Sequence, residues 1–345
     1  MNENQKTLKM SEKSSSNQQT GNESMTTFPL EGAEIKDSSY VLIQGLSIAA
    51  GPLPGLPKVY HFGECGPYYA MVMELLGPNL EQLMVANNSR FSLRTTTQIA
   101  IMILEIMRSV HSKKIIFCNV KPENFCLGRP NTAKSNQVYM VGLINAKLFE
   151  TADSKHIPKI SANDTEQEPK KFGVYGTPRY MSLHAHKGKE LSRRDDLESI
   201  GYMLLYFLHG KLPWQGLPIN NSTSNNNSEK YENIFITKKM IHLDELCANL
   251  PPEYYHYMLY VRSLKFAQEP NYRYLITMFT KLLYRINMDQ SRLVSPSLMN
   301  DMAITFDEQL LSSLNNNNNS NNNKNESSSS SKKQVSFKMD HETLE

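Results

Sequence analysis

The side chains with the clearest chemical potential lie together between residues 115 and 125, in the segment Ile-Ile-Phe-Cys-Asn-Val-Lys-Pro-Glu-Asn-Phe. They are Asn119, Lys121 and Asn124. A lysine ammonium is a positive charge that donates hydrogen bonds, whereas an amide side chain also offers one accepting oxygen. Because an amide oxygen is far too weakly basic to take a proton from a hydroxyl group, Asn119 cannot replace a carboxylate as a general base.

This segment resembles the catalytic loop of protein kinases, whose pattern is H-R-D-x-x-x-x-N. In that loop the Asp accepts the proton of the substrate hydroxyl and the Asn holds a metal ion. The three positions of H-R-D read Phe117-Cys118-Asn119 here, while Lys121 and Asn124 keep their spacing. The resemblance therefore implies a kinase-like loop without its catalytic acid.

Further motifs follow in the order and spacing of the casein kinase 1 family, and the gamma branch is the most similar. They are the segments 55–63, 69–78, 91–93, 121–125, 176–182, 192–201 and 212–216. The resemblance covers about two thirds of the chain, from about residue 55 to residue 286. It implies the α+β, two-lobed protein kinase fold with a mainly helical C-lobe, in which the N-lobe is truncated.

The same comparison exposes positions where the family pattern is broken. The D-F-G motif, which follows a predicted strand at 137–141, reads Gly142-Leu143-Ile144, and a glycine has no side chain to replace the metal-binding Asp. No G-x-G-x-x-G phosphate loop precedes the hinge, and Lys36 lacks the buried-strand context of an ATP-anchoring lysine. The hinge residues Glu74, Leu75 and Leu76 still offer backbone groups to an adenine ring.

These losses predict a pseudokinase that is not an enzyme, because a general base alone contributes roughly 10²–10⁴ in rate and phosphoryl transfer depends on metal and cationic stabilisation. Such a protein uses no cofactor and no metal, and acts by binding or scaffolding active relatives or their substrates. The alternative is a weak or atypical serine/threonine kinase that uses ATP and Mg²⁺. Lys121 and Asn124 then orient the phosphates while a substrate or other acid supplies the base. A degenerate product without a selected function is the third possibility.

Composition and periodicity divide the chain into four regions: a disordered polar N-terminus (1–27), a truncated N-lobe with the hinge (28–77), the C-lobe (78–290) and a disordered Asn/Ser-rich tail (291–345). The pattern predicts strands within 59–74, a helix at 93–111 capped by Ser92 and another at 196–208. The last two helices of the family correspond to 257–283. Asp196, on the second predicted helix, matches the kinase residue that hydrogen-bonds the catalytic-loop backbone, and its expected role is structural.

Two further segments have possible binding roles. Arg179 matches one basic residue of the family's anion-binding site, but the stretch 218–228, where relatives carry the others, contains no basic residue. In the tail, Lys333, Val335 and Phe337 fit the pattern by which many proteins bind protein phosphatase 1, through addition of an extended strand. A random tail segment is the simpler interpretation of these three residues.

Composition excludes several other classes of protein. The formal net charge of +3 indicates no nucleic-acid partner, and the four cysteines lack the C-x-x-C spacing of a zinc site. No run approaches 18 apolar residues, so we expect no membrane span, and the polar N-terminus does not resemble a secretory signal. We therefore expect a cytoplasmic protein, or one shared with the nucleus.

Overall fold

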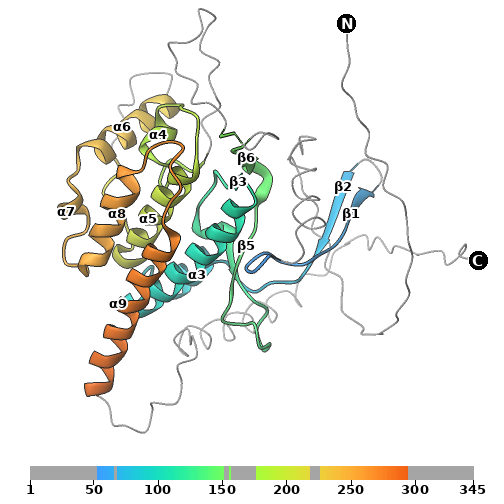
Figure 1. Cartoon of the computed structure of the whole chain (residues 1–345), viewed down its shortest axis with the longest axis horizontal. Helices are drawn as coiled ribbons and strands as arrows, with labels where there is room; N and C mark the ends of the chain where they lie inside the picture. Colours follow the sequence, from blue (N-terminus) through green and yellow to red (C-terminus); the bar gives the residue numbers. More distant parts are fainter. Residues whose placement is uncertain (1–52, 66–67, 151–154, 157–175, 218–225, 294–345) are drawn as a thin grey trace, which may run out of the picture. The chain divides into compact units, whose positions relative to one another are not determined.

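The computed structural model describes residues 53–65, 68–150, 155–156, 176–217 and 226–293 (Figure 1). About half of the described chain is helical, and the strands are short. The predicted α+β class with a mainly helical C-lobe is confirmed. The expected shortening of the N-lobe concerns residues 28–52, which lie outside the described residues together with the predicted disordered ends and the docking segment.

The first two strands form an antiparallel pair, β1 (Val59–Cys65) and β2 (Tyr68–Met73), in which Phe62 is opposite Met71. Both strands lie within the range 59–74 expected to contain them. The turn before β1 is fixed to the C-lobe, because the amide of Met140 donates a 2.7 Å hydrogen bond to the carbonyl of Gly55. The start of the strand pair is therefore attached to the C-lobe by this hydrogen bond, in addition to the covalent connection through the hinge after β2.

Eight helices make up about half of the described chain. They are α2 (Leu80–Ala86), α3 (Leu93–Ser112), α4 (Leu183–His186), α5 (Arg193–His209), α6 (Asn226–Met240), α7 (Leu243–Leu246), α8 (Pro252–Ser263) and α9 (Tyr272–Leu293). None of these helices is long and apolar enough to cross a membrane.

Helix α3 is the centre of the core. It begins where the hydroxyl of Ser92 accepts a hydrogen bond from the amide of Thr95, so the predicted cap is confirmed. Its apolar side chains, among them Ile99, Ile103 and Met107, are fully buried, and the helix packs against α5 and α9. The predicted spacing thus marks the face that contacts the other helices.

Two small strand pairs and two 3₁₀ turns frame the segment that carries the candidate site. Strand β3 (Ile115–Ile116) pairs with β6 (Lys147–Leu148), and β4 (Phe125–Leu127) pairs with β5 (Val138–Met140). The turns are η1 (Pro122–Asn124) and η2 (Leu143–Asn145). The catalytic-loop segment runs from β3 to β4, and the D-F-G position begins two residues after the end of β5.

Some predicted bounds differ from the structure. The helix predicted at 196–208 starts at Arg193, because Ser192 and Asp195 form a capping box there. The last helix, expected to end near residue 283, continues to Leu293 and passes the predicted domain end at residue 290. The apolar stretch 41–50, where the sequence allows a short helix, and the segment 301–314, whose apolar residues have partly helical spacing, lie outside the described residues.

Candidate active site

Asp196 organises the backbone of the catalytic-loop segment from the first turn of α5. Its carboxylate accepts hydrogen bonds from the amides of Phe117 (2.7 Å) and Cys118 (2.8 Å), and its side chain is only 3 % exposed. Hydrogen bonds to an ionised, buried acceptor are stronger than neutral ones. Asp196 therefore has the position expected of the kinase residue that it matches.

A second partner of Asp196 is His111, which the sequence analysis had not assigned to the site. The Nε2 atom of His111 lies 2.9 Å from the Asp196 carboxylate, and its Nδ1 atom is hydrogen-bonded to the hydroxyl of Tyr272 on α9. Because a carboxylate only accepts, Nε2 donates its proton to Asp196, and in the neutral ring Nδ1 accepts from the hydroxyl of Tyr272. The last helix is thus connected through His111 to the loop. The sequence feature that could have indicated this contact is a histidine at the end of the predicted helix 93–111, shortly before the loop.

Cys118 occupies the centre of the loop in the left-handed backbone region, with φ at 62°. The chain turns here directly after the second of the two amides that bind Asp196. The pKa of the Cys118 thiol is raised well above its usual value, first by burial and then by the nearby Asp196 charge. Cys118 is therefore a buried, neutral thiol.

The loop brings Asn119, Lys121 and Asn124 together. The side-chain amide of Asn124 donates a 2.8 Å hydrogen bond to the carbonyl of Asn119, and Asn124 is 9 % exposed. Lys121 precedes the η1 turn, and its carbonyl accepts a hydrogen bond from the amide of Asn124. Since Asn119 and Lys121 are only partly buried, both side chains adjoin solvent while the backbone between them is fixed.

Gly142 lies beside this loop. Its backbone is left-handed, with φ at 78° and ψ at 42°, and the amide of the preceding Val141 donates a hydrogen bond to the carbonyl of Asn124. A Cβ atom at Gly142 would lie 2.7 Å from the side-chain oxygen of Asn124. The two positions that the family uses for metal binding are therefore neighbours, as the resemblance implies.

The donor atoms at these two positions do not fit a magnesium site held by the protein. Magnesium prefers one or two carboxylates in addition to the phosphates of a substrate. Here the pair supplies one amide oxygen, from Asn124, and Gly142 supplies no side chain. We therefore derive no step through a bound metal ion.

The hinge residues connect β2 to the helical lobe. The amide of Glu74 donates to the carbonyl of Lys58 at 2.7 Å, and the Glu74 carboxylate lies 3.7 Å from the ammonium of Lys134. Leu75 is 41 % exposed, and Leu76 is partly buried. The amide of Gly77 then donates to Leu127 at 2.8 Å, which joins the end of the hinge to β4.

Arg179 packs against aromatic rings in the described structure. Its guanidinium lies over Tyr180 and Tyr206, at 5.6 and 5.3 Å from the ring centroids, and donates to the hydroxyl of Tyr180. Its carbonyl accepts a hydrogen bond from the indole of Trp214 at 2.8 Å. These contacts brace the segment after Gly176. Anion binding by Arg179 stays a prediction.

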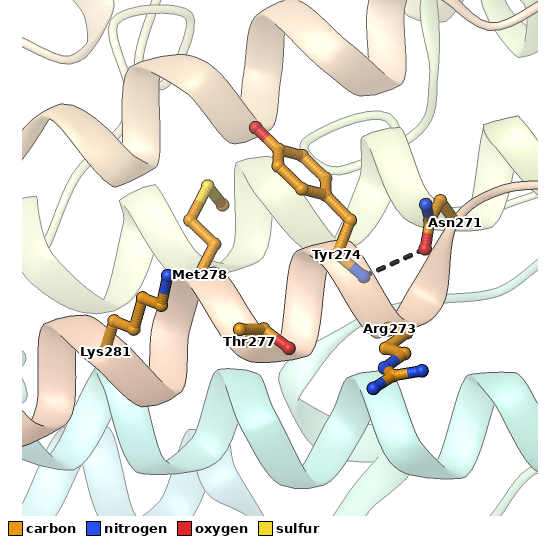
Figure 2. Close-up of a pocket in the computed structure, with 6 residues that line it drawn as sticks. All are labelled: Asn271, Arg273, Tyr274, Thr277, Met278 and Lys281. Carbon is orange, nitrogen blue, oxygen red and sulfur yellow. Dashed lines mark hydrogen bonds between the residues drawn. The ribbon is translucent and has the colours of Figure 1, made fainter.

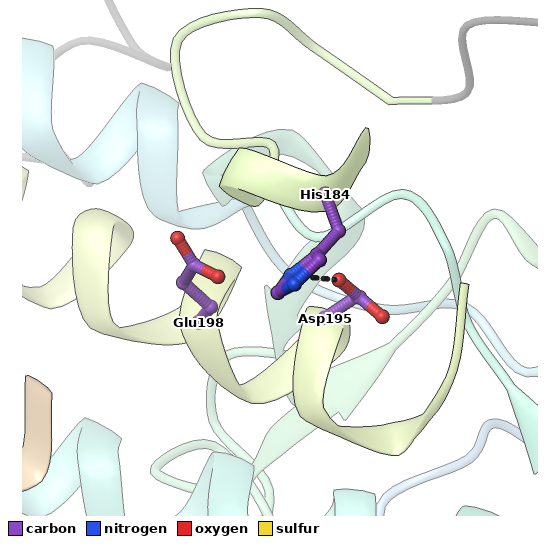
Figure 3. A group of neighbouring side chains, drawn as sticks. All are labelled: His184, Asp195 and Glu198. Atoms are coloured by element: carbon purple, nitrogen blue, oxygen red, sulfur yellow. Dashed lines mark ion pairs between the residues drawn. The ribbon is translucent and has the colours of Figure 1, made fainter. Parts of the chain in front are cut away.

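A group of three side chains with metal-ligand chemistry lies near α4 (Figure 3). His184 faces Asp195 at 3.5 Å, and Glu198 lies one turn further along α5. The carboxylates already have protein donors, because Asp195 accepts from the hydroxyl of Ser182 (2.6 Å) and Glu198 from the amide of Leu183 (3.0 Å). The group therefore anchors the start of α4.

A surface hollow of about 410 Å³ lies along α9 and the turn before it (Figure 2). Its lining residues are Asn271, Arg273, Tyr274, Thr277, Met278 and Lys281. None of them belongs to the catalytic-loop segment. The hollow is therefore not part of the candidate active site.

Comparison with known proteins identifies the class. The chain matches the protein kinase domain family over residues 53–281, and it therefore belongs to that family. Among curated proteins it is similar to casein kinase I homolog 1 (40 % identity over 248 residues, 72 % of this chain and 52 % of the relative) and casein kinase I homolog 2 (42 % over 236 residues, 68 % and 51 %), both of Schizosaccharomyces pombe. It is also similar to casein kinase I homolog 2 of Saccharomyces cerevisiae, at 36 % over 245 residues (70 % and 41 %). The chain spans about half the length of the curated relatives it matches.

These findings support the casein kinase 1 resemblance and correct one prediction. The prediction that the chain is not an enzyme is wrong, because the matched family is that of protein kinases and the relatives, about 40 % identical, are casein kinase I proteins. The pseudokinase prediction was based on the replacements at Asn119 and Gly142, and the chain matches the protein kinase family in spite of both. The alternative, an atypical kinase, agrees better with the comparisons.

Proposed function

We propose that the chain is a serine/threonine protein kinase of casein kinase I type, which transfers the terminal phosphate of ATP to a hydroxyl group of a protein substrate. The observation that carries this proposal is the fixed loop, in which Asp196 binds two successive backbone amides and Asn124 binds the carbonyl of Asn119. Catalysis of phosphoryl transfer is mostly positioning and charge stabilisation. A rigid loop that carries a lysine and an amide fulfils the positioning part.

The proposed reaction forms a bond between the substrate oxygen and the terminal phosphorus and breaks the bond from that phosphorus to the bridging oxygen of ADP. Lys121 stabilises the charge on the phosphate oxygens, and Asn124 orients them. The Asn119 amide accepts a hydrogen bond from the hydroxyl but does not take its proton. A carboxylate of the substrate takes that proton, and we expect a rate about 10²–10⁴ below that of a kinase with its own base.

Phosphate transfer by the purified full chain tests the proposal directly. With labelled ATP and dephosphorylated casein, the wild-type protein should transfer phosphate slowly. Lys121→Ala and Asn124→Ala should each abolish the transfer. Lys189→Ala, which removes an exposed lysine outside the loop, is the matched control and should keep the wild-type rate. Transfer that survives both loop substitutions would contradict the proposal.

A thermal melt with ATP separates nucleotide binding from transfer. A ligand at about 100 times its Kd stabilises a protein by about 2.7 kcal/mol, which raises the Tm of a domain of this size by a few degrees. We expect such a rise with ATP and Mg²⁺. The absence of any shift at millimolar ATP would count against the nucleotide site, whatever the transfer assay gives.

Finer assignments rest on sequence motifs alone. We infer membership of the gamma branch from the hinge motif, and docking of protein phosphatase 1 from Lys333, Val335 and Phe337, which lie outside the described residues. A variant with Val335 and Phe337 changed to Ala should lose that binding in a pull-down with the purified phosphatase. A cytoplasmic or nuclear location, which fluorescence microscopy of a tagged chain would check, is also a proposal.

A further inference from the structure

Lys238, near the end of α6, is wholly buried, which is rare for a lysine. Its ammonium donates to the carbonyls of Pro178 (2.7 Å) and Met181 (2.8 Å) and lies 3.1 Å from the Nε2 atom of His186. An ammonium has three N–H groups, so each of them has one acceptor here. The side chain therefore joins α6 to the segment that follows Gly176.

The surroundings of Lys238 combine burial with groups that attract a positive charge. Desolvation by burial lowers its pKa well below the usual value, and the nearby Glu198 opposes this effect. The rings of Tyr202 and Trp214 face the ammonium, with centroids at 4.9 and 5.1 Å, which adds cation–π attraction. Burial also lowers the pKa of His186 to about 3, so this ring is neutral near pH 7 and accepts from the ammonium.

The segment held by Lys238 lies against the catalytic loop. A Cβ atom at Gly176 would be 3.2 Å from the carbonyl oxygen of Cys118, and Met181 shares a small apolar cluster with Cys118 and Ile116. Within the segment, the amides of Tyr180 and Met181 both donate to the carbonyl of Thr177. Residues 177–181 therefore form a tight turn next to the loop. Lys238 binds the carbonyls of Pro178 and Met181 in this turn.

An apolar side chain at position 238 would leave the carbonyls of Pro178 and Met181 without the partner that the structure gives them. A buried acceptor that loses its donor costs about 1–3 kcal/mol. The turn would regain hydrogen bonds by moving toward water and away from the loop. The hydrogen bonds of Lys238 therefore hold the turn against Cys118 on the catalytic loop.

We propose that Lys238 is a positioning residue that holds residues 177–181 beside the catalytic loop as a preformed ledge for the protein substrate. The proposal rests on the proposed kinase function. It adds that α6, a helix outside the catalytic motifs, holds residues 177–181 in place through Lys238. The adjacent Lys239 is exposed, so Lys239→Met makes the same chemical change one position away and is the matched control.

Hydrogen exchange of the full chain tests the positioning without any need for activity. Lys238→Met should speed exchange of the amides of Tyr180 and Met181 at least tenfold, whereas Lys239→Met should leave them unchanged. Amides in the middle of α3 report whether the variant is folded. A folded Lys238→Met protein with wild-type exchange at both amides would overturn the proposal.

A second readout separates positioning from a merely structural role. In the transfer assay, Lys238→Met should raise the KM for the protein substrate at least fivefold and leave the KM for ATP unchanged. A lower kcat with an unchanged KM for the protein substrate would indicate that Lys238 has only a structural role. It would overturn the proposal that residues 177–181 form a ledge for the substrate. If the wild-type protein transfers no phosphate, the proposed function fails, and the exchange experiment still decides whether Lys238 holds the turn.

If Lys238→Met does not fold, His186→Leu replaces it. This change removes one of the three acceptors and keeps the two carbonyl partners. It should speed exchange at Tyr180 and Met181 by a smaller factor, about threefold. No change at either amide would contradict the role of the Lys238 hydrogen-bond set.

Discussion

The side-chain oxygen of Asn124 lies so close to Gly142 that a Cβ atom on this glycine would be 2.7 Å away. Asn124 has little freedom to move, because its amide donates to the carbonyl of Asn119. Gly142 therefore replaces the metal-binding Asp of the family pattern, and it is also part of the packing of the loop. Restoring a side chain at position 142 must displace Asn124 or shift the backbone.

Gly142→Ala should destabilise the protein more than Gly216→Ala. Both glycines have positive φ, 78° and 71°, so each alanine incurs about 1–2 kcal/mol of left-handed strain. A Cβ atom at Gly216 meets nothing within 4 Å, whereas the one at Gly142 displaces Asn124 and its hydrogen bond. Urea unfolding should give a difference of about 1 kcal/mol. Equal losses would mean that Asn124 moves without cost.

Asn119→Asp should raise the rate of phosphate transfer. The substitution provides a carboxylate where the family pattern has its base, and a positioned base contributes roughly 10²–10⁴ in rate. Asn119→Ala, which lacks both the amide and the acid, should show no gain. An Asp variant that binds ATP normally but transfers at the wild-type rate would show that proton removal does not limit the reaction.

The sequence predicted the parts of the fold that depend on local patterns. The start of α3 at Leu93 and the position of β5 follow from a capping serine and from an apolar strand. Asp196 was named from a motif on one helix, and in the structure its carboxylate binds two amides of the loop. These features need no knowledge of distant contacts.

The residues that the sequence did not reveal depend on tertiary contacts. Lys238 and Lys239 form a cationic pair in the last turn of a helix, a position typical of exposed lysines. Lys238 is buried whereas Lys239 is exposed, because the carbonyls of Pro178 and Met181, about sixty residues earlier, accept hydrogen bonds from Lys238. The bond between His111 and Tyr272, 161 residues apart, is equally invisible to a local pattern.

Asp196→Asn and Tyr272→Phe should give graded losses of stability. The first change replaces a charged acceptor of two backbone amides and should cost about 3 kcal/mol or more, because each bond to a charged group contributes about 1.5–3 kcal/mol. The second removes one hydroxyl and leaves Nδ1 of His111 without its hydrogen-bond partner, at about 1–2 kcal/mol. Chemical denaturation of both variants tests this order. A larger loss from Tyr272→Phe would contradict it.

His186 should make the protein less stable as the pH falls below about 6.5. Burial and the neighbouring Lys238 charge lower its folded-state pKa to about 3, whereas the unfolded chain has a value near 6.5. Between these values the unfolded state binds more protons, so this stability is complete above about pH 6.5 and decreases toward pH 3. At pH 5 the loss is about 2 kcal/mol. His186→Gln keeps an acceptor for Lys238 but does not titrate, and its decrease in unfolding free energy from pH 7.5 to 5 should be smaller by that amount. The same decrease in both proteins would show that His186 is not held neutral.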